Sequence, residues 1–284
     1  MTFWFIQILN GVSLGMLLFL LSAGFTMIFG LMQIINLAHG SFYLLGAYIG
    51  LMIMKATGNF SLALLSGAVA TTLIGLVIHR WLLRRYQKEH LSQVLLTLGL
   101  LFLLGDLALY IWGPEPKVMP KPLFLGGAVQ WGPVLYPKYR LAIILAGLFV
   151  AGLLWLFQEH TRFGAMVRAC VDDLDMASAV GIKVPFMMAC VFGLGAFLAG
   201  MSGVLGAAVL GVFPGVDFHV LLLAFIVVIV GGAGSLKGAF VASILIGLLD
   251  NFGKALFPEV SMFTLFAAMG AVLSLRPTGL FGRK

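Results

Sequence analysis

The sequence predicts an all-α polytopic membrane protein: a bundle of eight or nine transmembrane helices, one or more of them broken, with short cytoplasmic helices. Of the 284 residues, 62% are hydrophobic and only 10% are charged, whereas soluble domains carry about 25% charged residues. The mean hydropathy of +1.12 also belongs to a membrane protein. The 36 glycines suit closely packed transmembrane helices. We expect residues 1–284 to form one transmembrane domain.

Nine stretches approach the roughly 20 apolar residues that a helix needs to cross the hydrocarbon core. They are 4–31, 36–54, 61–79, 91–112, 140–157, 186–212, 219–232, 238–256 and 260–275. The first lacks a basic leader region and a cleavage site, so it is predicted to be a span and not a signal peptide. Residues 219–232 would extend only about 21 Å as a helix. This piece is predicted to be broken or re-entrant, and 260–275 is also short.

Basic residues predict the orientation, because cytoplasmic loops collect Lys and Arg. The loop 79–90 contains four of them, Arg80, Arg84, Arg85 and Lys88. Placing this loop in the cytoplasm puts 158–185, the 233–238 turn with Lys237 and the C-terminal tail there too, with eleven of the 17 Lys and Arg residues in all. The net charge of +7 then reflects topology, and nucleic acid is not an expected partner.

The proline-rich segment 113–139 falls on the outer side and cannot be a regular helix. It is either a surface for an extracellular partner or an ordinary irregular loop.

A charged segment, 164–181, interrupts the apolar chain with a helical pattern. One side of the helical wheel carries Val167, Cys170, Val171, Leu174, Ala177 and Ser178, and the other carries Arg168, Asp172 and Asp175. The helix macrodipole disfavours three Asp residues in a C-terminal half, so a break near Asp172 is predicted. Asp172 would cap a second helix with Asp175 at its N3 position, and Gly181 would end it. The alternative is a solvated loop.

A small and polar face is predicted along 36–50. Taken as a helix, it places Asn36, His39, Tyr43, Gly46, Ala47 and Gly50 within an arc of about 100°. Polar groups at membrane depth face the bundle interior or a water-filled cavity, and Gly46-x-x-x-Gly50 permits close helix approach. The face either lines a solute path or packs against another helix. Nothing in the spacing makes His39 a metal ligand.

The run Gly231-Gly232-x-Gly234-x-x-x-Gly238 differs from the dinucleotide-binding fingerprint by one residue and lacks its βαβ context. A tight turn or broken helix is predicted instead, and such breaks often line transporter solute sites.

Three charged residues fall within predicted spans. Asp250 and Lys254, four residues apart, are expected to pair or to reach the interface, with a solute contact as the alternative. Asp106 needs a partner on another helix or contact with water. Cys170 and Cys190 lack metal-ligand spacing and are expected to be structural.

Three stretches in the same order resemble the permeases of branched-chain amino acid ABC importers. They are INLAHGSFYLLGAYIG (35–50), RFGAMVRACVDDLDMASAVGIKV (162–184) with FLAGMSGVLGA (197–207), and VIVGGAGSLKGAFVASILIG (228–247). The resemblance implies a multi-pass permease of the bacterial inner (plasma) membrane. Its implied partners are a second related permease in a heterodimer, two cytoplasmic ATPases and a periplasmic solute-binding protein. Other members of this family carry other amino acids, amides or urea.

By the same resemblance, 158–185 couples the permease to the ATPase. The implied coupling residues are Arg168, Asp172, Asp173, Leu174, Asp175, Ala177 and Gly181. The motif of the wider importer class contains a Glu that is absent from Met176-Ala177-Ser178-Ala179. The candidate residues for a solute path or close packing come instead from the face of 36–50 and the glycine run, and are Asn36, His39, Tyr43, Gly46, Gly50, Gly231, Gly232 and Gly234.

The sequence has no G-x-x-x-x-G-K-[ST] motif, so ATP would be used by a partner subunit. We expect a transport subunit and not an enzyme, with no cofactor or metal bound by this chain. A self-sufficient secondary transporter or channel is the rival of another class.

Overall fold

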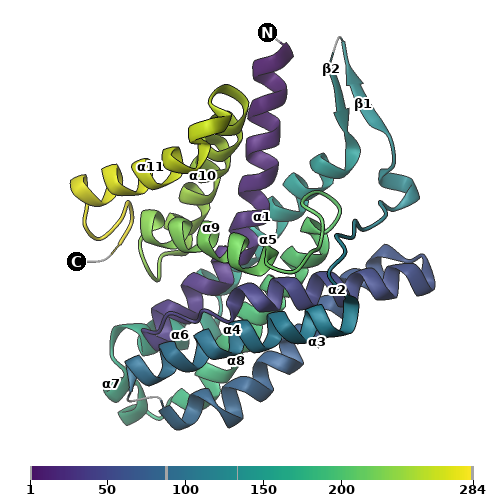
Figure 1. The fold of residues 1–284 in the computed structure, drawn as a ribbon. Coiled ribbons are helices and arrows are strands. Elements are labelled where there is room, and N and C mark those ends of the chain that lie inside the picture. The colour runs from purple at the N-terminus through teal and green to yellow at the C-terminus, as the bar shows by residue number, and fades with distance from the viewer. Residues whose placement is uncertain (1, 87–88, 133, 283–284) are drawn as a thin grey trace.

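The computed structural model describes residues 2–86, 89–132 and 134–282. Gln87 and Lys88 of the basic loop lie outside the described residues. Within them, the chain is predominantly helical (Figure 1). An all-α polytopic fold is therefore confirmed.

The helices follow one another along the chain with short connections, except for the long segment 113–137. The long ones are α1 (Thr2–Met32), α2 (His39–Thr57), α3 (Phe60–Trp81), α4 (His90–Trp112), α5 (Lys138–His160), α8 (Val184–Gly206), α9 (Val216–Gly231), α10 (Leu236–Leu256) and α11 (Ser261–Leu275). The short ones are α6 (Arg162–Asp172) and α7 (Leu174–Ala179), with 3₁₀ turns η1 (Leu83–Tyr86), η2 (Leu123–Leu125) and η3 (Pro258–Val260).

Six helices among the described residues are long and apolar enough to cross a membrane, namely α1, α3, α4, α5, α8 and α10. The predicted number of eight or nine is therefore not reached by these criteria. The other candidates are α2, whose 19 residues include many small and polar ones, α9 with 16 residues and α11 with 15.

Helix α1 forms the centre of the fold. It is apolar on all sides and buried along most of its length, as expected for a helix that other helices surround. It contacts α5, α8, α9 and α10. In Figure 1, α9, α10 and α11 lie on one side of α1, and α5 with the hairpin lies on the other.

Helix α9 connects two parts of the bundle. Near its start, a Cβ placed on Gly40 of α2 would come within 2.4 Å of the Asp217 carbonyl oxygen. At the end of α9, a Cβ placed on Gly231 would come within 2.5 Å of the Gly238 carbonyl carbon of α10. The predicted short piece at 219–232 is thus a real helix that bridges α2 and α10.

The outer segment 113–139 contains structure that the sequence did not predict. Strands β1 (Ala128–Trp131) and β2 (Val134–Pro137) form an antiparallel hairpin. In addition, Lys117 and Val212 exchange two backbone hydrogen bonds of 2.8 and 2.7 Å, which fasten this segment to the α8–α9 connection. Strands of four residues are too short for an alternating pattern to be recognised among the prolines.

Candidate coupling segment and solute path

The charged segment consists of two short helices, and Asp173 is the residue at which they meet. Its backbone is extended (φ −156°, ψ 110°), and its Oδ1 accepts hydrogen bonds from the backbone N–H groups of Asp175 and Met176, both 2.9 Å. The predicted cap at Asp172 is therefore wrong by one residue, because Asp172 still belongs to α6. Asp175 lies at N2 instead of N3, where its charge favours the helix N-terminus.

Gly181 ends the second helix, as predicted. Its φ is +89°, which only glycine adopts without strain. The Gly181 N–H donates to the Ser178 carbonyl and the Ile182 N–H donates to the Ala177 carbonyl, both at 3.0 Å. These two bonds form a Schellman motif, which satisfies carbonyl groups at the helix end.

The apolar side of the segment faces the chain's own spans. Val167, Cys170 and Ala177 are buried; α6 contacts α1 and α8, and α7 contacts α8. The predicted docking side is therefore covered in part within this chain, whereas Leu174 and Ser178 of the same side are exposed. The burial of apolar surface is the main stabilising term in folding, so the buried side chains pack against the neighbouring spans of the same chain. Met176 and Val180 remain exposed, with relative exposures of 63% and 72%.

Arg168 fastens α6 to the end of α5. Its guanidinium donates to the Gln158 carbonyl and lies 3.5 Å from the Glu159 carboxylate. Thr161 caps α6 by accepting from the Gly164 N–H at 3.0 Å. Sequence reasoning missed Thr161 and Glu159, although a Thr directly before the first residue of a helix is a recognisable cap.

Leu174, the first residue of α7, is partly exposed and borders a crevice of about 210 Å³. The crevice is lined by Met32, Gln33, Ile34, His90, Leu174 and Met188. It therefore separates the charged segment from the link between α1 and α2. Gln33, in that link, has a left-handed backbone with φ 55°, which ends α1.

Asn36 lies in this non-helical link and not on α2, which begins at His39. The prediction of a helix from 36 was wrong because 33–38 leaves the helical path. The Asn36 side chain is buried, and neither its amide oxygen nor its nitrogen has a hydrogen-bond partner among the described residues. His39 is also buried, with Nε2 3.0 Å from the Leu21 carbonyl oxygen of α1.

The glycines of α2 lie in its contact with α8. A Cβ on Gly46 would lie 2.5 Å from the Gly200 Cα, and one on Gly50 would lie 2.7 Å from Val204 Cγ2. Tyr43 is buried on the same face, and its hydroxyl has no partner among the described residues. The geometry of Gly46 and Gly50 is that of close helix packing. A role of this face in the solute path stays a prediction.

The glycine run forms the tight turn that the sequence predicts. Gly232 and Gly234 have φ values of +97° and +80°. Ser235 caps α10 by accepting from the Gly238 N–H at 3.1 Å. The C-terminal tail pairs with the end of α9, since the Leu280 N–H donates to the Val230 carbonyl at 2.8 Å.

Asp250 and Lys254 form the expected ion pair, with 2.7 Å between Oδ2 and Nζ. The Asp106 side chain, on α4, is exposed. A further carboxylate, Asp217, is buried in the first turn of α9. Sequence reasoning missed Asp217, although an acidic residue next to a predicted span is a recognisable signal.

The fold and the candidate site are those of a multi-pass helical membrane protein in which two short helices, α6 and α7, lie beside the bundle of long helices. The chain belongs to the family described as branched-chain amino acid transport system, permease component, whose model matches residues 7–273. It is 30% identical to the high-affinity branched-chain amino acid transport system permease protein BraD of Pseudomonas aeruginosa, over 98% of this chain and 95% of the relative. It is 31% identical to LivH, of the same description, from Salmonella typhimurium, with the same coverage. No solved structure matches.

Proposed function

We propose that this chain is the permease subunit of an ABC importer that carries branched-chain amino acids across the bacterial inner membrane. The observation that carries the proposal is the family match over residues 7–273, which spans both the α2–α8 contact and the α6–α7 segment. The related permeases of P. aeruginosa and S. typhimurium serve branched-chain amino acids. ATP would be bound and hydrolysed by two cytoplasmic partner subunits, and this chain would bind no cofactor.

The assembly would contain a second, related permease and a periplasmic solute-binding protein. On the side facing the ATPase, we assign the contact to the exposed surface of α7, with Asp173, Asp175, Met176 and Val180. This replaces the part of the apolar side formed by Val167, Cys170 and Ala177, which the chain's own helices cover. Movement of α7 would reach the α1–α2 link through Leu174 and the crevice beside Gln33.

The proposal includes nine passages through the membrane. Six are made by the long apolar helices. The others are α2, α11 and the broken passage that consists of the α8–α9 connection and α9. The cytoplasmic side then holds the α1–α2 link, the α6–α7 segment and the tail, and the outer side holds the hairpin β1–β2.

Other solutes and another class remain as rivals. Urea, amides and other amino acids are carried by similar permeases. The xylose/arabinose import permease XylH of Sulfolobus acidocaldarius shares 30% identity over 58% of this chain and 46% of its own length. A secondary transporter or channel would move solute through this chain alone, without ATPases.

The test is reconstitution of this chain in vesicles with its partner permease, ATPases and solute-binding protein. Uptake of L-leucine should require ATP and all partners, and the leucine-loaded binding protein should stimulate ATP hydrolysis. Met176→Asp should reduce co-purification of the ATPase, whereas Lys138→Met, on the outer side, should not. Leucine uptake by this chain without ATPases would refute the importer, and uptake of another solute in place of leucine would refute the substrate.

A further inference from the structure

A turn rich in arginine lies at the end of α3, where the chain passes into η1. Arg80 is in the last turn of α3, and Arg84 and Arg85 belong to η1. All three side chains are exposed, and guanidinium groups keep their positive charge at any physiological pH. We call residues 80–86 the arginine turn. It gathers three positive charges at one end of α3.

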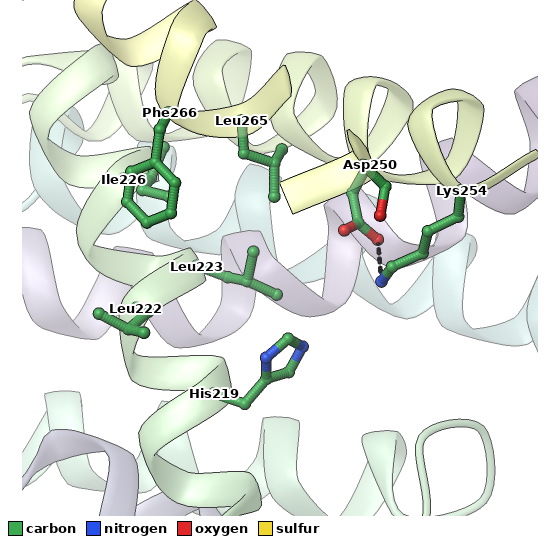
Figure 2. Close-up of a pocket in the computed structure, with 9 residues that line it drawn as sticks. His219, Leu222, Leu223, Ile226, Asp250, Lys254, Leu265 and Phe266 are labelled. Atoms are coloured by element: carbon green, nitrogen blue, oxygen red, sulfur yellow. Dashed lines mark hydrogen bonds and ion pairs between the residues drawn. The ribbon is translucent and has the colours of Figure 1, made fainter. Parts of the chain in front are cut away.

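The charges of the arginine turn are not neutralised by ion pairs within the described part of the chain. In the Asp250–Lys254 pair of Figure 2, by contrast, a carboxylate meets the cation directly. Among the described residues, no carboxylate forms an ion pair with the guanidinium groups of the turn. Glu89, the acidic residue that follows the turn, accepts a hydrogen bond from the Ser92 hydroxyl at 2.7 Å. The three guanidinium groups are therefore available to an anion from outside the chain.

The backbone of the turn is held in place before any ligand binds. Leu83 is buried, and its carbonyl accepts a hydrogen bond from the Gln93 side chain of α4 at 3.0 Å. The Leu82 N–H donates to the Ile78 carbonyl at 2.9 Å, which continues α3 into the turn. A rigid platform loses little conformational entropy on binding, so this preorganisation favours affinity.

Two aromatic side chains flank the cations. Trp81 and Tyr86 are 66% and 41% exposed. Trp and Tyr are enriched where a membrane meets water, because their rings lie at the level of the lipid head groups. The same rule places the arginine turn at head-group depth, where lipid phosphates are found.

An apolar stripe leads along α3 to the turn. Its members are exposed and recur every three or four residues, so they share one face of the helix: Leu62, Leu65, Val69, Leu73 and Val77. Arg80 follows Val77 by three residues and continues this face. A ligand at this surface meets cations at one end and aliphatic side chains along the rest. That is the polarity of a phospholipid, whereas a soluble anion or a polar protein loop would leave the stripe unused.

We propose that the arginine turn binds a phospholipid with a net negative charge, such as phosphatidylglycerol, in the leaflet that covers this end of α3. The guanidinium groups hold the phosphate, because the planar fork of arginine matches phosphate oxygens and gives strong charge-assisted hydrogen bonds. Trp81 and Tyr86 lie beside the glycerol, and an acyl chain follows the stripe. A zwitterionic phospholipid binds less well, because its ammonium group is repelled by the same cations. This inference goes beyond the proposed function, since it requires no particular solute.

The test measures contact between Trp81 and lipid in the complete importer. The importer is placed in phosphatidylcholine nanodiscs that contain increasing fractions of phosphatidylglycerol brominated near the head group, because bromine quenches tryptophan fluorescence on contact. The contribution of Trp81 is the signal that a Trp81→Phe variant lacks. We expect half-maximal quenching at a lower fraction of brominated phosphatidylglycerol than of brominated phosphatidylcholine. Equal fractions for the two lipids would overturn the proposal.

Charge variants separate a defined site from general attraction to a positive protein. Each Arg near an anionic membrane strengthens binding by about fivefold. Arg84→Gln should therefore raise the half-maximal fraction of phosphatidylglycerol by about fivefold, and Arg80→Gln combined with Arg84→Gln and Arg85→Gln should abolish the preference.

The matched control removes the same charge from exposed positions elsewhere, through Lys121→Gln combined with Lys138→Gln and Lys183→Gln. This variant should keep the preference for phosphatidylglycerol. Retention of the preference without the three arginines, or its loss in the lysine control, would overturn the site. A preference that appears only when the ATPases are removed would also overturn it, because the ATPase and not a lipid would then cover the turn. An importer that carries a solute other than leucine should show the same lipid preference, so this proposal and the substrate assignment fail separately.

Discussion

Gly46 of α2 and Gly200 of α8 lie in backbone contact, since a Cβ on Gly46 would come within 2.5 Å of the Gly200 Cα. One turn further along α2, Gly50 lies against Val204 of α8. Such contacts let two helices approach closely and gain packing energy where no hydrophobic force between helices exists. Side chains larger than hydrogen at these positions would push the two helices apart.

Gly46→Ala should therefore destabilise the bundle by about 1–3 kcal/mol, the range for overpacking a close contact. The measurement is the midpoint of thermal unfolding of the purified protein in detergent. Gly99→Ala on α4 is the matched control, because nothing lies within 4 Å of its added methyl group. Equal midpoints for both variants would mean that α2 and α8 do not meet at Gly46.

Thr71→Val should loosen the contact between α3 and α8. The Thr71 hydroxyl lies 3.1 Å from the Ala196 carbonyl of α8, as well as bonding within its own helix. Interhelical hydrogen bonds in membranes contribute about 0.6 kcal/mol on average and up to about 1.7. Thr72→Val is the control, because the Thr72 hydroxyl bonds to Ala68 within α3. The Thr71 variant should unfold at the lower temperature, and the reverse order would contradict the assigned bond.

Asp173→Ala should weaken α7 by about 1 kcal/mol through loss of its cap. Asp173→Asn should preserve α7, because an amide oxygen can accept the same hydrogen bonds from Asp175 and Met176. Hydrogen exchange of the α7 amides is the direct measurement. Faster exchange in the Ala variant alone is expected, and equal exchange in the Ala and Asn variants would show that the carboxylate does not cap the helix.

The orientation of the chain predicts opposite reactivity for two exposed positions. In a background with Cys170→Ala and Cys190→Ala, a cysteine replacing Asp173 should react with an impermeant thiol reagent only in inside-out vesicles. A cysteine replacing Leu123, which is 100% exposed, should react only from the outside. Labelling of both from the same side would exclude the proposed topology.

Several features of this protein followed from the sequence by itself. Its composition determined a polytopic helical membrane protein, because apolar stretches of about 20 residues satisfy their backbone hydrogen bonds in lipid by forming helices. The Gly181 stop, the Gly231–Gly238 turn and the Asp250–Lys254 pair were also predictable, since each depends on residues within about one or two helical turns. Local geometry decides such features before any tertiary contact forms.

Tertiary structure alone decided which surfaces remain available. The apolar side of α6–α7 matched a docking face in sequence, but Val167, Cys170 and Ala177 on that side are buried within the chain's own bundle. Residues 33–38 are not helical, so Asn36 lies outside α2. The N-cap of α7 is Asp173 and not Asp172, because α6 continues through Asp172. His219 joined Asp250 and Lys254 only through the packing of α9 against α10. These relationships join residues far apart in the chain, so no periodicity within one segment could have specified them.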